Sequence, residues 1–565
     1  MDRRRFVQGL TLAGLAGAGL PALAQPGGAI LRGPDIDLTL GAAPVNITGR
    51  RRLATLVNGM MPGPLLRWRE GDTVTIRVRN GLAETSSIHW HGLKLPNAMD
   101  GTPGLTFAGI PPGESFTYRF PLVQSGTYWY HSHSGMQEQT GLFGSIVIDP
   151  LAPDPVAYDR EYVIHLSDWT DEDPMAIVAN LKQQGDYYNN QRRTLGTFIG
   201  DVRKAGLSAA LQDRLMWGQM RMAPTDIMDV TGAVYTFLVN GMPPAANWTG
   251  LFRPGEKVRL RVINSAAMTT FDLRIPGLPL TVVQADGCNV EPVTVEELRI
   301  GVAETYDILV SPADAAYTIF AQAQDRSGFA RGTLAPRAGM AAPVPALDPP
   351  PLRSMADMGM AGMDHGAHGA APASGHDGHE GMVMAAPAVA NASGVDPATL
   401  KGQPFVDGVA MMPVSRLGEA GTGLDGNGRN TLRYSQLRAL EAPAYTLEPS
   451  RDIEFHLTGN MERWTWGFDG KKFSEAPPVR VALGETVRFV LINDTMMEHP
   501  IHLHGFFFTV ENGQGDRQPL KHTLNVKPGE KAGIVFTADE PGHWAFHCHL
   551  MFHMDMGMFR TVLVA

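Results

Sequence analysis

The chain has 565 residues, of which 44% are hydrophobic and 18% are charged, and its formal net charge is −10. This length predicts several domains, each with its own core. The 63 glycines and 42 prolines predict many turns, which is typical of a β-rich architecture. The negative charge and the lack of a basic stripe in the sequence exclude nucleic-acid binding.

The N-terminal stretch MDRRRFVQGLTLAGLAGAGLPALAQ has the pattern of an export signal. Consecutive arginines precede an apolar run, and Ala22-Leu23-Ala24 is a small-x-small cleavage site. We expect residues 1–24 to be a twin-arginine signal peptide that directs the protein to a periplasm. The alternative is a membrane anchor, but the apolar run is short for a bilayer span, so we expect no stable anchor.

Three segments resemble one another: GDTVTIRVRN (71–80), GEKVRLRVIN (255–264) and GETVRFVLIN (484–493). Each is a Gly-acid turn followed by alternating apolar residues, which predicts a half-buried β-strand. Three copies at wide spacing predict three β-sandwich domains, which we place at residues 30–150, 155–335 and 440–565.

The first and third repeats share a histidine pattern that the second lacks. IHWHG and GTYWYHSH follow the first repeat, and IHLHG and GHWAFHCH follow the third repeat at matching positions. The stretch after the second repeat, FDLRIPG, has no histidine, so the middle domain is expected to be a spacer. The two matched sets comprise His89, His91, His131, His133, His502, His504, His547 and His549.

The last motif, HCHLMFHMDMGM, predicts a blue-copper site. Side chains alternate along a strand, so His547 and His549 should face one way and the Cys548 thiolate the other. A cysteine with two histidines and a weak axial methionine is the blue-copper ligand set, here His499, Cys548, His553 and Met558. The matching positions in the first domain, Ser86, Ser132, Gln137 and Leu142, lack all four ligands.

Other histidines and the second cysteine fit structural roles. We expect His165, His456, His522 and His543 to be satisfied or solvated, and Cys288 to be a buried small apolar residue. Two cysteines allow at most one disulfide, so the chain is no disulfide scaffold.

The motifs HWHG, HSH, HPIHLHG and HCHLMFHMDMGM resemble those of multicopper oxidases, and the three-domain layout extends the resemblance over nearly the whole mature chain. The resemblance implies all-β architecture with three cupredoxin-like Greek-key sandwiches and four copper ions. It implies that His89 and His502 hold the type 2 copper. Asp100 matches the acidic residue that helps deliver protons, whereas Met554 stands where some relatives have a second carboxylate. The type 3 pair would be held by His91, His131, His133, His504, His547 and His549.

Residues 340–400 form an insertion rich in Ala, Gly, Pro, Met and His, which cannot bury a core and is expected to be disordered. Thioethers select Cu(I), so this segment is a candidate copper-collecting arm. Met554 and Met556 are further candidates. The candidate ligands in the insertion are Met355, Met358, Met360, Met363, His365, His368, His376, His379, Met382 and Met384. A second insertion, 175–225, contains LSAALQDRLMWGQM, which predicts a short helix.

The insertion and the stretch MRMAPTDIMDVTGAVYTFLVNG (220–241) most resemble the periplasmic copper-resistance oxidases of the CopA type. The leading hypothesis is a monomeric periplasmic oxidase that couples Cu(I) oxidation to reduction of dioxygen to water, with Cys548 as electron conduit. One alternative is a laccase-like oxidase of phenols or Fe(II). The other is a copper-sequestering protein whose oxidase centre is secondary.

Overall fold

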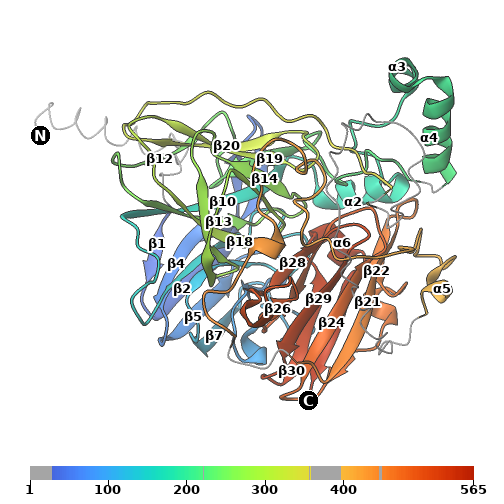
Figure 1. The fold of residues 1–565 in the computed structure, drawn as a ribbon. Coiled ribbons are helices and arrows are strands. Elements are labelled where there is room, and N and C mark those ends of the chain that lie inside the picture. The colour runs from blue at the N-terminus through green and yellow to red at the C-terminus, as the bar shows by residue number, and fades with distance from the viewer. Residues whose placement is uncertain (1–27, 220–221, 356, 358–395, 444–447) are drawn as a thin grey trace, which may run out of the picture.

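The computed structural model describes residues 28–219, 222–355, 357, 396–443 and 448–565. The described strands form six sheets, which pair into three cupredoxin-like β-sandwiches (Figure 1). In chain order the sandwiches appear in blue, green and orange to red, and the second lies above the other two in this view. The expected all-β, three-sandwich fold is confirmed.

The first sandwich packs sheet β1-β4-β9-β8-β6 against sheet β3-β2-β5-β7. Its core contains Trp68, Trp90 and Tyr130, each fully or almost fully buried. Its elements are β1 (Ile30–Arg32), β2 (Asp35–Asn46), β3 (Arg51–Val57), β4 (Gly63–Arg69), β5 (Thr73–Asn80), β6 (His89–His91), η1 (Asn97–Met99), β7 (Ser115–Pro121), β8 (Gly126–His131) and β9 (Phe143–Asp149).

The second sandwich pairs sheet β11-β10-β13-β18-β15-β16 with sheet β12-β20-β19-β14-β17. Its strands are β10 (Arg160–Thr170), β11 (Tyr235–Val239), β12 (Trp248–Leu251), β13 (Val258–Asn264), β14 (Phe271–Arg274), β15 (Leu280–Ala285), β16 (Cys288–Val295), β17 (Glu297–Ile300), β18 (Thr305–Val310), β19 (Tyr317–Ala323) and β20 (Phe329–Ala335).

The third sandwich pairs sheet β22-β21-β24-β29-β26-β27 with sheet β23-β31-β30-β25-β28. Its elements are β21 (Arg451–Asn460), β22 (Thr465–Phe468), η4 (Phe473–Glu475), β23 (Val479–Val481), β24 (Thr486–Asn493), β25 (His499–Leu503), β26 (Phe508–Val510), η5 (Gly515–Arg517), β27 (Leu520–Lys521), β28 (Thr523–Val526), β29 (Lys531–Thr537), β30 (Gly542–Cys548), α6 (Met551–Asp555) and β31 (Phe559–Val564). The short elements α5 (Pro397–Leu400) and η3 (Tyr434–Gln436) precede it.

The three sequence repeats are the equivalent strands β5, β13 and β24. Each pairs in parallel with an earlier strand of its sandwich, β2, β10 or β21. Each also ends in a fully buried asparagine whose side-chain amide donates two hydrogen bonds to backbone carbonyls. These asparagines are Asn80, Asn264 and Asn493. The repeat therefore encodes one strand and the anchor of the loop that follows it.

Three helices of the second insertion lie on the side of the third sandwich (Figure 1). They are α2 (Pro174–Gln183), α3 (Leu195–Ala205) and α4 (Leu207–Gln219), so the predicted short helix is α4. Helix α2 starts where the Asp173 side chain accepts hydrogen bonds from the amides of Met175 and Ala176. Beyond α2, a Cβ on Gly185 would lie 2.5 Å from the Met461 carbonyl oxygen, so this segment touches the third sandwich.

Residues 1–24 and residues 358–395 of the Met/His insertion lie outside the described part of the chain. Within the described part, no helix is long and apolar enough to cross a membrane.

Candidate metal centre

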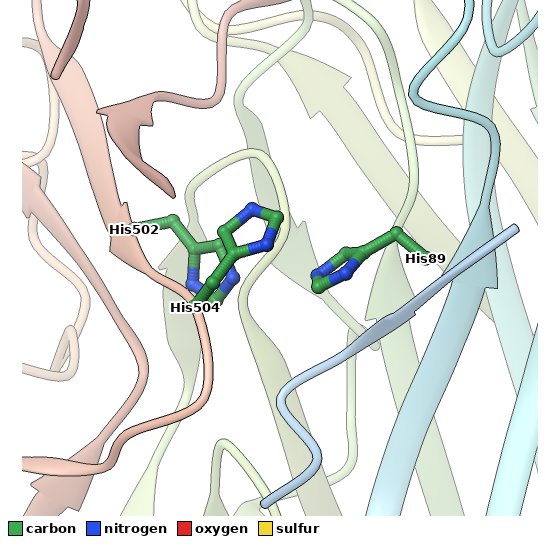
Figure 2. Close-up of side chains that lie close together, drawn as sticks. All are labelled: His89, His502 and His504. Atoms are coloured by element: carbon green, nitrogen blue, oxygen red, sulfur yellow. The ribbon is translucent and has the colours of Figure 1, made fainter. Parts of the chain in front are cut away.

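The eight matched histidines converge between the first and third sandwiches. In the first sandwich β6 pairs with β8 so that His89 faces His131, and in the third β25 pairs with β30 so that His502 faces His547. The rings then meet across the interface. The centroids of His89 and His504 lie 3.8 Å apart, as do those of His91 and His502. Figure 2 shows His89 pointing toward His502 and His504 from the opposite side.

Each imidazole presents one nitrogen that has no protein partner outside the cluster. Six of these atoms are buried without any hydrogen bond: Nε2 of His89, His131, His133, His502 and His549, and Nδ1 of His91. The other two, Nε2 of His504 and Nε2 of His547, lie 3.0 Å apart. Buried polar atoms are costly when unpaired. Eight such nitrogens facing a common space are therefore a fit for bound metal ions.

In several of these rings the second nitrogen, called the outer nitrogen because it points away from the cluster, is held by a hydrogen bond. His89 Nδ1 donates to the Asp100 carbonyl oxygen at 2.8 Å, and His502 Nδ1 donates to the His522 carbonyl oxygen at 2.7 Å. His547 Nδ1 donates to the Cys548 carbonyl oxygen at 2.9 Å. A donating outer nitrogen fixes the tautomer in which the inner nitrogen carries a free lone pair. These hydrogen bonds thus favour the neutral form of each ring, with its inner nitrogen free to bind a metal ion.

The electrostatics of the cluster favour the same neutral form. Burial, together with the neighbouring imidazoles, lowers the pKa of His91, His131 and His133 well below its usual value. Burial lowers the pKa of His547 to about 4. Neutral imidazole is the form that binds metal.

Asp100 lies at the edge of the histidine cluster and is 1% exposed. Its carboxylate accepts a hydrogen bond from His504 Nδ1 at 3.1 Å and from the Thr102 hydroxyl at 2.7 Å. Its backbone carbonyl holds His89. Asp100, which the sequence analysis expects to help deliver protons, therefore contacts a histidine of each sandwich. Its side chain contacts His504 of the third sandwich, and its backbone carbonyl contacts His89 of the first.

A second buried carboxylate, Glu138, was not predicted from the sequence. Its Oε2 lies 2.6 Å from His131 Nδ1, and its side chain is 2% exposed. Burial, with a contribution from the charge of Asp168, raises the pKa of Glu138 well above its usual value. Glu138 follows the HSH motif within the turn SGMQEQT, and the spacing alone gave no sign that the chain folds back onto His131.

The predicted blue-copper ligands also come together. Cys548 Sγ lies 3.5 Å from His499 Nδ1 and 3.9 Å from His553 Nδ1, and all three residues are buried. Met558 is fully buried, and its backbone carbonyl accepts a hydrogen bond from the Cys548 amide. Burial raises the pKa of the Cys548 thiol. A thiolate at this position therefore needs a cation such as copper to stabilise it.

In the two predicted blue-copper histidines, the ring nitrogen that points away from Cys548 has a partner that the sequence did not reveal. His553 Nε2 lies 2.8 Å from Asp229 Oδ2, and Trp464 Nε1 donates to the other oxygen of Asp229 at 2.9 Å. Trp466 stacks on His553 with a centroid distance of 3.8 Å. The Thr495 hydroxyl contacts His499 Nε2 at 2.7 Å. Asp229 belongs to the segment between α4 and β11, so the middle region of the chain helps to build this site.

In the first sandwich, a hydrogen-bonded network occupies the position that corresponds to the predicted blue-copper site of the third sandwich. The hydroxyls of Ser86 and Ser132 both donate to Gln137 Oε1, at 2.6 and 2.9 Å. The Leu142 amide donates to the Gln137 carbonyl, as the Met558 amide donates to the His553 carbonyl in the third sandwich. The backbone around the two sites is therefore equivalent, which matches the register predicted from the sequence.

The remaining candidate Cu(I) ligands differ in how far they are buried. Met355 is buried, whereas Met554 and Met556 are half-buried at α6. The other candidate ligands of the insertion, from Met358 to Met384, lie outside the described residues. Both cysteines are free, and Cys288 is half-buried.

Of the histidines expected to be structural, His543 is exposed, while His165 bonds to the Ser265 hydroxyl. His456 bonds to Asp494. His522 is a ninth buried imidazole beside the cluster, 4.8 Å from His91 between ring centroids.

Family models of multicopper oxidases match the chain at residues 39–153, 160–337 and 446–565, one for each sandwich. The chain belongs to the multicopper oxidase family. This multicopper oxidase is 54% identical to a copper resistance protein A homolog of Pseudomonas syringae pv. tomato, over 100% of this chain and 99% of the relative. It is 51% identical to copper resistance protein A of Escherichia coli, with the same coverage of both chains.

The fold of this multicopper oxidase is shared with solved structures. The structure of Fet3p, a multicopper oxidase that functions in iron import, superposes with a TM-score of 0.65 at 20% identity, over 94% of this chain and 90% of that chain. The family assignment makes the chain an oxidoreductase with copper cofactors, and the convergent histidines are where its own residues can hold them.

Proposed function

We propose that this multicopper oxidase couples the one-electron oxidation of Cu(I) to the four-electron reduction of dioxygen to water, as part of copper tolerance in a periplasm. The observation that carries the proposal is the junction at Cys548. There the blue-copper ligand set and the eight-histidine cluster are joined through adjacent residues of one strand. The relatives named for copper resistance support copper, rather than an organic molecule, as the donor.

The geometry supports a division of the eight histidines among three copper ions. Ligand atoms of His133, His504 and His547 lie within 4.8 Å of one another. A second trio, His91, His131 and His549, has ring centroids 4.9 to 5.7 Å apart. We assign these two trios to a type 3 pair.

His89 and His502 remain as ligands of a type 2 copper, with ring centroids 6.0 Å apart. With the blue copper at His499, Cys548, His553 and Met558, the proposed total is four copper ions.

The electron count follows from this arrangement. Four Cu(I) ions each lose one electron, and one dioxygen takes up four electrons and four protons to form two water molecules. Bound copper supplies the redox chemistry. The chain supplies the path, because Cys548 is covalently adjacent to His547 and His549, and it supplies buried carboxylates beside the cluster. Asp100 can hold a proton at Oδ1 or Oδ2, within hydrogen-bond distance of His504.

The proposed location and state of the protein rest on the sequence. Residues 1–24 are proposed as a twin-arginine signal, so the mature protein would reach the periplasm and act there as a monomer. The Met and His residues of 355–384 are proposed to collect Cu(I), since thioethers select this soft ion.

Oxygen uptake by the copper-loaded protein tests the donor assignment. We expect Cu(I) to give a higher kcat/KM than Fe(II) or a phenol when the three are compared in one buffer. Faster uptake with a phenol or with Fe(II) would favour a laccase-like oxidase. No uptake above the uncatalysed rate with any donor would favour copper sequestration.

A further inference from the structure

The hairpin turn between β15 and β16 of the second sandwich reaches both outer sandwiches. Asp286 and Gly287 form this two-residue turn with φ values of 48° and 76°, a conformation that Asp-Gly sequences favour. A Cβ on Gly287 would lie 2.3 Å from the Tyr128 hydroxyl oxygen of the first sandwich, so the turn packs tightly there. Asp286 is fully buried and contacts the third sandwich. The turn is therefore held between the first and third sandwiches.

The Asp286 carboxylate is surrounded by hydrogen-bond donors from two sandwiches. Its Oδ1 accepts from the Thr305 amide of its own sandwich at 3.0 Å. Its Oδ2 accepts from the backbone amides of His522 and Thr523, at 3.2 and 3.1 Å. The same Oδ2 lies 3.0 Å from the ammonium nitrogen of the fully buried Lys521. Asp286 thus fixes the backbone of residues 521–523 in the third sandwich.

The two residues whose amides Asp286 holds contact a histidine of each outer sandwich. His502 Nδ1 donates to the His522 carbonyl oxygen at 2.7 Å. The Thr523 hydroxyl oxygen lies 3.3 Å from His91 Nε2 and 3.3 Å from His502 Nδ1. In both rings this is the outer nitrogen, since the inner nitrogen has no hydrogen bond. Residues 522 and 523 therefore orient the rings of His91 and His502.

Charge balance alone does not account for the contacts of Asp286. The Lys521 ammonium also lies 2.9 Å from Glu304, so it already has a second buried carboxylate. Neutralising Lys521 would not require that Asp286 also accept two backbone amides in succession. The amide contacts point instead to control of the backbone at residues 522 and 523.

We propose that Asp286 is a positioning residue for the proposed copper ligands His502 and His91, acting through His522 and Thr523. Groups that hold the outer nitrogen of a ligating histidine fix its orientation, and their loss typically weakens metal binding about tenfold to a hundredfold. The second sandwich, which carries none of the eight histidines, acts on the cluster through this turn. The assignment of His502 to the type 2 copper rests on the proposed function.

Two sites of substitution test the proposal. Asp286→Asn keeps the size of the side chain but replaces one acceptor oxygen by an NH2 group. This group must face either the Thr305 amide or the amides of residues 522 and 523, so donors oppose donors. Thr523→Val removes the hydroxyl that contacts both histidines, whereas Thr523→Ser keeps it.

The matched control is Glu297→Gln, which changes another fully buried carboxylate of the second sandwich. Glu297 pairs with Arg274 and Arg429. This variant should lower the thermal midpoint without altering the copper sites, so it separates lost stability from lost positioning. Each full-length protein is loaded with copper, and electron paramagnetic resonance (EPR) records the type 2 signal. Competition with a chelator measures the affinity for the type 2 copper.

We expect Asp286→Asn to weaken type 2 copper binding about tenfold or more and to change the hyperfine splitting of its EPR signal, while the blue absorption persists. Thr523→Val should change the same signal, and Thr523→Ser should restore the wild-type spectrum. Wild-type spectra and affinities in both Asp286→Asn and Thr523→Val would overturn the proposal. If Asp286→Asn does not fold, a wild-type spectrum in Thr523→Val alone overturns it.

Oxygen uptake by wild type separates this proposal from the proposed function. If wild type shows the type 2 signal but does not oxidise Cu(I), the donor assignment fails, and altered spectra in Asp286→Asn and Thr523→Val still establish the positioning role. If wild type oxidises Cu(I) and both variants keep its spectrum, the donor assignment stands and the positioning role fails.

Discussion

Cys548 contacts one group of ligands through its side chain and is joined to another through its backbone. Its Sγ faces His499 and His553, while its chain neighbours His547 and His549 face the eight-histidine cluster. Neighbouring side chains of a strand point to opposite faces, so Cys548 can contact the first group with its side chain while its neighbours belong to the second group. Under the proposed function, this residue therefore carries both the blue colour and the electron transfer.

Replacing Cys548 by serine should abolish the blue absorption and the oxidase activity together, because the thiolate is both a ligand and the conduit. The eight histidines are untouched, so metal analysis should find three copper ions per molecule instead of four. The control is Cys288→Ser, which changes the other, half-buried cysteine and should leave both colour and oxygen uptake intact. A blue band that survives in the Cys548 variant would refute the assignment.

The sequence predicted the ligand candidates at residue scale because their patterns are local. H-x-H on a strand and the spacing of HCHLMFHMDMGM can be read without knowing the fold. The residues that support those ligands could not be found in this way. Asp229 contacts His553 although it lies 324 positions earlier in the chain. The Thr523 hydroxyl contacts His91 Nε2 although Thr523 lies 432 positions later. Such contacts exist only once the sandwiches have packed.

At the scale of elements, the buried asparagine that ends each repeated strand holds the loop after it. The Asn493 side chain accepts from the Thr495 amide and donates to the Met497 carbonyl. Asn80 and Asn264 make the corresponding bonds in the other sandwiches. The alternating pattern predicted the strands, but not this use of their last residue, because a polar residue at a strand end is also typical of an exposed turn.

Strand β21 provides a pH-dependent contribution to stability through His456. Burial lowers the pKa of His456, but hydrogen bonds with Asp494 and Glu454 outweigh burial and raise it to about 9. A raised folded-state pKa stabilises the fold fully below the unfolded value of about 6.5. This stabilisation is lost as the pH rises through about 9, and it amounts to about 3 kcal/mol at most.

The thermal midpoint of His456→Gln should therefore lie below that of wild type at pH 6, and the gap should narrow between pH 7 and pH 10. Scanning calorimetry or circular dichroism at several pH values measures this gap. His543→Gln, which changes an exposed histidine of β30, should match wild type throughout. A gap that is constant with pH would mean that His456 contributes through packing alone.

At the scale of the whole molecule, the histidine cluster needs both ends of the chain. The repeats predicted three similar sandwiches, yet they did not predict which surfaces meet. Buried ion pairs help to hold the second and third sandwiches together. Arg299 pairs with Asp272 of its own sandwich and with Glu498, the residue before the proposed blue-copper ligand His499. Such charge pairs depend on three-dimensional complementarity, which the alternation of apolar residues does not encode.

Removing residues 358–384 should lower Cu(I) oxidation at limiting Cu(I) while sparing the bound copper ions, whose proposed ligands all lie elsewhere. A tethered set of soft ligands raises the local concentration of Cu(I), so the loss should disappear when Cu(I) is saturating. The measurement is the ratio of Cu(I) to phenol turnover, with and without the segment, at equal copper loading. A parallel fall in both activities would assign the segment to folding, and an unchanged ratio at low Cu(I) would make it a passive linker.

The hydrogen-bonded network of Ser86, Ser132 and Gln137 has a consequence for electron supply. Ser132 lies between His131 and His133 just as Cys548 lies between His547 and His549, and the surrounding backbone bonds are equivalent. The first sandwich thus has the same backbone arrangement as the predicted blue-copper site but lacks its metal-binding side chains. A cysteine at position 132 would reach the same histidine cluster from the opposite side. Serine at position 132 offers no thiolate, so under the proposed function every electron for dioxygen passes through Cys548.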